Sequence, residues 1–173
     1  INRFEGYYSK ERAVGCATSH NALLHQLKDQ DTPFLVLEDD VEPAKFKSVI
    51  KNIPDNADAL YLGNSIFGLW GAKGEPRISA EKVDSSFYQI YNMLSAHAIL
   101  YLNNDYVKFL AKATDLLVSL KDNQDKARAH TMRYFNVYAL NHPAFFQGGK
   151  HEKVTNVSIS NLNYVNKSRI FTI

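Results

Sequence analysis

Hydrophobic and polar residues follow one another along the chain in blocks that predict alternating helices and strands. Ser9 can cap a first helix, and small or apolar positions recur behind it at helical spacing: Ala13, Ala17, His20, Leu24 and Leu27. Residues 34–38 follow, with four apolar residues and a first acid. Such a run, directly behind Asp31-Thr32-Pro33, predicts a buried strand that is parallel to its neighbours and central in a sheet.

Later blocks continue this alternation. Pro43 predicts the start of a second helix, whose apolar stripe is Phe46, Val49, Ile50 and Ile53. Asn104 predicts the cap of another helix, whose face carries Val107, Leu110, Ala111, Thr114 and Leu117. Strands are predicted at residues 58–62, 87–91, 97–102 and 135–140. The pattern predicts a single α/β domain over residues 1–173, with a mixed, mainly parallel sheet.

One long connection interrupts the pattern. Residues 64–84 contain several glycines around Trp70, the only tryptophan. This composition is typical of a mobile loop that closes over a site. It is equally typical of a surface excursion in which the tryptophan is tucked down for packing, and the sequence leaves both interpretations open.

Size and charge narrow the classes of function. The chain has 173 residues, 19.6 kDa and a net charge of +2, which is too weak for a nucleic-acid-binding surface. Cys16 is the only cysteine, so we expect no internal disulfide and no cysteine-based metal site. No apolar run approaches the roughly 18 residues of a transmembrane span. These features predict a cytoplasmic protein, or one that lies peripherally at a membrane, with no nucleic-acid partner.

Three consecutive acids, Glu38, Asp39 and Asp40, are the strongest chemical signal. The carboxyl end of a strand in an open α/β sheet is where ligands bind. Carboxylates crowded there repel each other, and burying them without a partner is costly. A hard divalent cation that carries a phosphate would satisfy them. The triplet therefore indicates an enzyme that handles nucleotides.

Several classes of protein place acids behind an apolar strand. A phosphate-receiver domain is excluded, because the next strands end in Gly63-Asn64 and Asn92 and no strand-terminal lysine follows. A metal-dependent phosphatase of the haloacid-dehalogenase type fits poorly, because the run lacks the threonine of an Asp-x-Asp-x-Thr pattern. The metal motif of sugar-nucleotide transferases fits best, since Glu38 and Asp40 are spaced to reach one cation. An exposed acidic turn that caps the helix at Pro43 is the structural alternative.

A second motif lies upstream of the triplet, in Val14-Gly15-Cys16-Ala17-Thr18-Ser19-His20. A Gly-Cys-x-x-Ser-His helix followed by an apolar strand ending in Glu-Asp-Asp resembles glycosyltransferase family 25, which includes lipooligosaccharide and procollagen galactosyltransferases. Residues 60–63 and 95–100 are similar to later strands of the family, and Pro143, Gln147 and Ser158 follow its closing pattern. The resemblance extends over most of residues 12–160 and is specific in the first part.

The resemblance implies a GT-A-like fold and a metal-dependent hexosyltransferase of glycan or lipopolysaccharide biosynthesis. Such an enzyme uses Mn²⁺ or Mg²⁺ and moves a sugar, galactose or a related hexose, from a UDP-sugar to a hydroxyl with inversion. The acceptor would be a glycan, a lipooligosaccharide or a glycoprotein. Family members begin with an apolar strand and a helix, whereas this chain opens with a short extended piece, residues 1–4. We therefore also expect that the first βα element is missing, and a non-catalytic nucleotide- or sugar-binding relative is the alternative function.

The resemblance also implies roles for single residues of the acidic motif. Asp40 is expected to bind the metal directly, and Glu38 to contact the ribose or to reach the metal. Asp39 is assigned to the nucleotide-sugar site, with its side chain turned toward the preceding helix. Ser19 and His20 would orient the acidic loop, although a histidine on an apolar helix face is often simply a satisfied core group.

The remaining assignments are Gly63 and the general base. Gly63 is assigned to the nucleotide-sugar site. Inverting transfer needs a base that takes the proton of the acceptor hydroxyl. Asp125, aligned with a late acidic position of the family, is the candidate, against the alternative of a plain surface acid at a helix end. His97 and His142 are the reserve candidates for the base.

Overall fold

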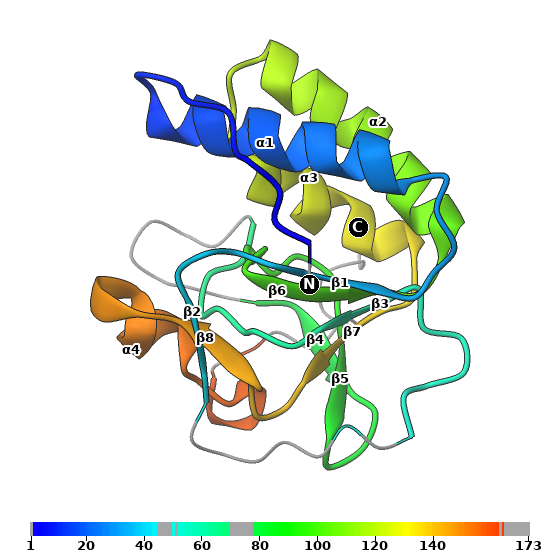
Figure 1. The fold of residues 1–173 in the computed structure, drawn as a ribbon. Coiled ribbons are helices and arrows are strands. Elements are labelled where there is room, and N and C mark those ends of the chain that lie inside the picture. Colours follow the sequence, from blue (N-terminus) through cyan, green and yellow to red (C-terminus); the bar gives the residue numbers. More distant parts are fainter. Residues whose placement is uncertain (1, 45–49, 51, 70–77, 163, 165–173) are drawn as a thin grey trace, which may run out of the picture.

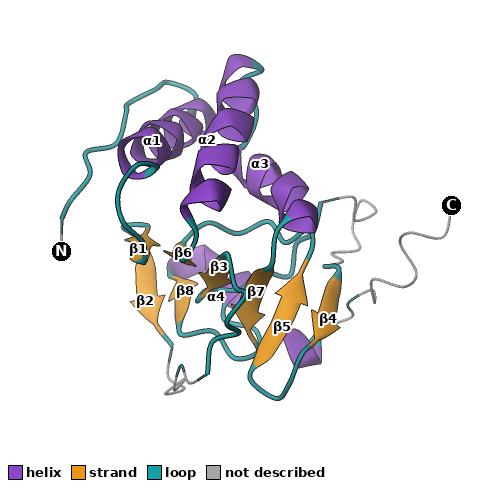
Figure 2. Ribbon diagram, turned by 90° about the vertical axis from the view of Figure 1, so that its right-hand side faces the viewer, coloured by secondary structure: helices purple, strands orange, loops and turns teal. Residues whose placement is uncertain are grey.

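The chain folds into an α/β structure with a main sheet and a layer of helices on one face of that sheet (Figures 1 and 2). The structure is a computed structural model, and it describes residues 2–44, 50, 52–69, 78–162 and 164. Three helices form the layer: α1 (Arg12–Leu27), α2 (Asn104–Ser119) and α3 (Gln124–Thr131). They pack against one another above the sheet. A short fourth helix, α4 (Glu152–Thr155), lies apart from this layer, beside the small second sheet that is described below (Figure 1).

The main sheet has six strands in the order β1-β6-β3-β7-β5-β4. Their bounds are β1 (Phe34–Leu37), β6 (Ala98–Tyr101), β3 (Ala59–Tyr61), β7 (Val137–Leu140), β5 (Phe87–Ile90) and β4 (Ala80–Lys82). The sheet is mixed, as predicted, but the prediction that it is mainly parallel is wrong. Only β3 and β7 run parallel, and every other pair is antiparallel. Parallel neighbours need a long connection, and β3 and β7 are separated along the chain by β4, β5, β6, α2 and α3.

β1, the strand that ends in the acids, lies at an edge of the sheet. It pairs with β6 alone and is antiparallel to it, so the prediction of a central, parallel strand is wrong. Phe34 and Val36 pack against the core beneath the helices. Leu35 and Leu37, on the other face, remain 46% and 43% exposed. The prediction failed because a short apolar run indicates that a strand is hydrophobic. It does not indicate how many strands pair with it.

The helices agree with the predicted patterns except at their starts. α1 buries Gly15, Ala17, His20 and Leu24, and α2 buries Tyr106, Val107, Leu110, Ala111 and Thr114. α2 is capped by Asn103, whose side chain accepts the N–H of Asp105 at 2.8 Å, one residue earlier than predicted. α1 starts later than predicted: Ser9 accepts the N–H of Glu11 at 3.2 Å, and the helix follows.

A second, two-stranded sheet pairs β2 (Val41–Pro43) with β8 (Phe145–Gln147) in antiparallel register. Pro43 therefore lies in a strand, and the prediction that it opens a helix is wrong. Of the apolar stripe predicted behind it, Phe46 and Val49 lie outside the described residues, and Ile50 and Ile53, which are described, belong to no helix. Trp70 is also outside the described residues. This small sheet brings β8 beside the acidic turn.

Candidate functional site

The acidic turn after β1 is held by backbone contacts on two sides. The N–H of Glu38 donates to the carbonyl of His97 at 2.9 Å, which continues the pairing of β1 with β6. The carbonyl of Asp40 accepts the N–H of Gly148 at 3.0 Å, directly after β8. Residues 38–40 thus connect the main sheet to the small one, and their side chains are presented between β1, β6 and β8.

The carboxylates of Glu38 and Asp40 converge on one amide nitrogen, Nε2 of Gln147. This nitrogen lies 3.1 Å from Oε2 of Glu38, and 3.4 and 3.3 Å from the two carboxylate oxygens of Asp40. The structure therefore brings together the two acids that were expected to share a cation. A positively polarised N–H₂ group occupies the position between two carboxylates, which is the position a cation would favour.

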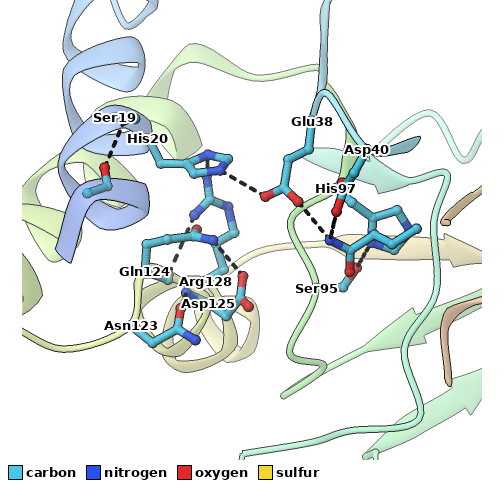
Figure 3. A network of polar contacts seen from close by, with 12 residues as sticks. Ser19, His20, Glu38, Asp40, Ser95, His97, Asn123, Gln124, Asp125 and Arg128 are labelled. Carbon is cyan, nitrogen blue, oxygen red and sulfur yellow. Dashed lines mark hydrogen bonds and ion pairs between the residues drawn. The ribbon is translucent and has the colours of Figure 1, made fainter. Parts of the chain in front are cut away.

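On its other side, Glu38 is held by His20. The His20 Nε2 atom lies 2.9 Å from Oε1 of Glu38, and the His20 Nδ1 atom lies 3.2 Å from Nη2 of Arg128 (Figure 3). A guanidinium group can only donate, so Nδ1 must accept. The imidazole proton is then on Nε2, and His20 donates to Glu38. A relay of two hydrogen bonds, from Arg128 to His20 and from His20 to Glu38, therefore fixes the orientation of the Glu38 carboxylate.

These partners keep Glu38 ionised. Burial by itself would raise the pKa of Glu38, but the hydrogen bond from His20 and the positive charges around it outweigh burial. Arg128 is among those charges. The pKa of Glu38 is therefore held below its ordinary value, and the group is a permanent anion at neutral pH. An ionised carboxylate is what a cation or a ribose hydroxyl requires.

Arg128 is the centre of this network and is only 1% exposed. Its guanidinium donates to the hydroxyl of Tyr101 at 3.4 Å and to the carbonyl of Gln124 at 3.5 Å. A buried cation without nearby anions would be very unfavourable. The negative charges of Asp125 and Glu38 lie close enough for Arg128 to lower the pKa of each carboxyl. Arg128 is thus charge-compensated by the same acids that it positions.

Asp125 lies in the first turn of α3, beside Arg128 (Figure 3). Its N–H donates to the side chain of Asn123 at 2.9 Å, and its carboxylate accepts Nε2 of Gln124 at 2.8 Å. Burial raises the pKa of Asp125, and the nearby Glu38 raises it further, although Arg128 acts in the opposite direction. A carboxylate with a raised pKa is a better proton acceptor than an ordinary one.

Ser19 and Gly63 were both assigned to the site from the sequence, but their contacts in the structure hold the fold together. The Ser19 hydroxyl accepts the N–H of Tyr7 at 2.7 Å and donates to the carbonyl of Gly15 at 2.8 Å, so it ties the N-terminal segment to α1. In Figure 3 it lies on the side of α1 away from Glu38. A Cβ atom on Gly63 would collide with the ring of His97. Gly63 therefore allows close packing. The Asp39 side chain is exposed.

The reserve bases differ in their surroundings. His97 is 1% exposed, and its Nδ1 atom lies 3.1 Å from the Ser95 hydroxyl. Burial lowers the pKa of His97, and the charges of Glu38 and Asp40 only partly oppose this. His142 is exposed, and its Nδ1 atom lies 2.6 Å from the Ser158 hydroxyl. Neither ring is both accessible and close to the acidic pair, so neither replaces Asp125 as the candidate base.

One further group of possible metal ligands consists of Cys16, His20 and Glu38, whose ligand atoms lie within 4.8 Å of one another. Two observations argue against a metal there. The His20 Nε2 atom carries the proton when Nδ1 accepts from Arg128, so it cannot coordinate at the same time. Partial burial and the charge of Glu38 raise the pKa of the Cys16 thiol to about 11. The oxygen atoms between Glu38 and Asp40 are the better candidates for a hard cation.

Sequence reasoning missed Arg128 and Gln124 entirely and noted Gln147 only as part of a motif. One local signal was available for Arg128, because it stands between Ala127 and Ala129 in a short helix, and small neighbours are typical of a packed face. No family model, curated protein or solved structure matches the chain. Among the described residues, no helix is long and apolar enough to cross a membrane.

Proposed function

We propose that this protein is a metal-dependent glycosyltransferase that transfers a sugar from a UDP-sugar to an acceptor hydroxyl. The observation that carries the proposal is the convergence of Glu38 and Asp40 on one amide nitrogen of Gln147. Two carboxylates separated by one residue, of which Glu38 is held by the hydrogen bonds from Arg128 through His20, form a preorganised cation site. The resemblance to glycosyltransferase family 25, through residues 14–20 and 38–40, supports a GT-A-like fold for this α/β sheet and UDP-galactose or a related donor.

The ligand set fits Mn²⁺ or Mg²⁺, because all its donors are hard oxygens. Asp40 and Glu38 would hold the cation, and Gln147 would turn its amide so that Oε1 faces the site. When bound, the cation neutralises the diphosphate that leaves with the nucleotide. Because His20 donates to Oε1 of Glu38, the oxygen that would face the cation is Oε2, which accepts the Gln147 amide in this structure.

Asp125 is the proposed general base. In this role its carboxylate takes the proton of the acceptor hydroxyl as the oxygen attacks C1 of the sugar. The bond from C1 to the diphosphate oxygen breaks on the opposite side, so the configuration is inverted. The burial that raises the pKa of Asp125 also increases its affinity for that proton. A glycan, a lipooligosaccharide or a glycoprotein is the acceptor class that the resemblance suggests.

The experiment that tests the proposal compares Asp40→Asn with Asp31→Asn. We expect UDP with Mn²⁺ to raise the melting temperature of the wild type by mass action. Asp40→Asn should lose that shift and the transfer of sugar from UDP-galactose. Asp31→Asn, a matched change at an exposed acid ahead of β1, should keep the metal-dependent shift. Full transfer by Asp40→Asn in the presence of metal would refute the assignment.

A non-catalytic nucleotide- or sugar-binding protein is the second candidate. It is favoured by the surroundings of Asp125, because the candidate base is partly buried and already accepts a hydrogen bond from Gln124 at 2.8 Å. Its outcome in the same experiment is distinct: UDP with Mn²⁺ would stabilise the wild type, yet neither hydrolysis nor transfer of the sugar would be detected.

A further inference from the structure

The outer side of α2 carries a row of apolar side chains that the fold does not cover. Phe109, Leu116 and Leu120 are 44%, 60% and 64% exposed. Their separations of seven and four residues place them on one face of the helix. Tyr134, which is 68% exposed, extends the row, with its ring 6.2 Å from that of Phe109. Scattered exposed apolar residues are normal, but a contiguous row that includes two aromatic rings indicates a contact surface.

Three lysines border this apolar row on the same helix or at its end: Lys108, Lys112 and Lys121. All three are exposed, and no ion pair occupies them within the described part of the chain. The neighbouring acids are largely occupied. Asp115 turns toward α1, where it accepts from Asn21 and contacts His25, each at 2.9 Å. Asp122 pairs with Lys126 at 2.8 Å. Asp105, in the first turn of α2, and the exposed Asp29, which follows α1, oppose the positive charge on this side.

A hollow of about 350 Å³ adjoins the lysines, between α1 and α2. Its lining includes three lysines, Lys28 just after α1 together with Lys108 and Lys112, and two acids, Asp29 and Asp115. Because Asp115 is engaged by Asn21 and His25, the three ammonium groups outnumber the one remaining acid. Such a groove suits a phosphate group, which accepts hydrogen bonds from several donors at once. The hollow and the apolar row thus lie on adjacent sides of one helix, with the lysines between them.

We propose that this side of α2 docks onto an anionic lipid surface. An apolar row inserts at the boundary of head groups and acyl chains, and flanking lysines bind the phosphates above it. Charge selects the occupant: a bilayer with anionic lipid complements the lysines, whereas a second copy of the chain would bring the same lysines against each other. The proposal concerns a surface distinct from Glu38 and Asp40, and it does not depend on the proposed transfer reaction.

Vesicle sedimentation tests this surface with the whole chain. Wild-type protein is mixed with vesicles of phosphatidylcholine alone, or of phosphatidylcholine and phosphatidylglycerol in equal parts. We expect binding to the anionic vesicles only, and weaker binding at high salt. Two double variants, Leu116→Ser with Leu120→Ser and Lys108→Glu with Lys112→Glu, should each weaken binding about tenfold or more. Matched controls are Val83→Ser and Lys82→Glu, exposed positions in and beside β4, which should bind as the wild type does.

Three results would overturn the proposal. The first is equal binding of the wild type to neutral and anionic vesicles, or binding to neither. The second is unchanged binding by both double variants, with circular dichroism showing them folded. The third is a wild-type dimer in solution that the Leu116 and Leu120 changes dissociate, which would make the row an interface between copies. If a double variant fails to fold, the wild type alone still tests the proposal, because its binding to neutral and to anionic vesicles can be compared.

Discussion

At the scale of single residues, the site is organised by a buried cation rather than by the acids alone. Arg128 can only donate hydrogen bonds, so it determines which nitrogen of His20 carries the proton. His20 in turn determines which oxygen of Glu38 remains available. A histidine that is 8% exposed on an apolar helix face is therefore both a core residue and part of the site. The two interpretations of His20 that the sequence left open are compatible.

Replacing Arg128 by methionine tests this relay. The variant keeps most of the side chain's volume but leaves Glu38 and Asp125 without their buried counter-charge. We expect the free energy of unfolding to fall by about 2–4 kcal/mol, measured by urea denaturation. Arg12→Met, at the exposed start of α1, is the control and should change stability little. A variant as stable as the wild type would mean that Arg128 is not charge-coupled to these acids.

The lowered pKa of Glu38 predicts acid sensitivity. A carboxyl whose pKa is lower in the folded state contributes stability above its unfolded pKa, and that contribution is lost as the pH falls through the folded value. Stability of the wild type should therefore fall below about pH 4, near the ordinary value of glutamate. Glu38→Gln should be less stable at neutral pH and should flatten this part of the curve. Identical pH profiles of the two proteins would contradict the assignment.

The raised pKa of Asp125 predicts the opposite sign. Ionising this carboxyl costs more in the folded state, so its effect on stability becomes unfavourable as the pH rises above the unfolded pKa. Asp125→Asn should be at least as stable as the wild type at neutral pH. If Asp125 is the base, the same variant should lose about 100-fold or more of its transfer rate. Loss of rate together with loss of stability would instead indicate a structural role.

At the scale of elements, the site depends on how short strands meet. The small sheet of β2 and β8 carries Gln147 to the acidic turn, and β1, which pairs with β6 alone, places that turn at an edge of the main sheet. The isolated bridge between Gly63 and Phe145 joins the end of β3 to β8. Gly63 therefore serves the site through packing, because it lets the ring of His97 lie directly against the backbone at this junction.

Gly63→Ala tests the junction. The added methyl group would meet the buried ring of His97, which cannot move without disturbing β6. Overpacking of this kind costs about 1–3 kcal/mol, and we expect the melting temperature to fall accordingly. Gly6→Ala is the control, because the nearest atom to its new methyl group is the Ser19 hydroxyl oxygen, at 3.2 Å. Equal melting temperatures of Gly63→Ala and the wild type would show that the junction is loosely packed.

At the scale of the whole molecule, two surfaces with different chemistry lie on different elements. The acidic turn is at the end of β1, between the two sheets, whereas the lysine-bordered apolar row is on α2, in the helix layer above the main sheet (Figure 2). If both proposals hold, the double change of Leu116 and Leu120 should weaken vesicle binding. It should leave the Mn²⁺-dependent thermal shift with UDP unchanged, because no residue of the acidic turn contacts α2 in the described hydrogen-bond network. Loss of both properties would indicate that the variant is misfolded.

The sequence by itself determined most of the longer local elements, although not α3 or the short strands β2, β4 and β8. Periodicity of apolar residues correctly predicted α1, α2 and the strands β3, β5, β6 and β7, because helical and extended spacing are properties of neighbouring residues. It also identified Glu38 and Asp40 as a pair, since two residues along the chain keep them close. Only the tertiary structure decided that β1 is an antiparallel edge strand. It alone brought in Gln147, 109 residues from Glu38, and Arg128, 108 residues from His20, because pairing across such separations depends on packing rather than on local pattern.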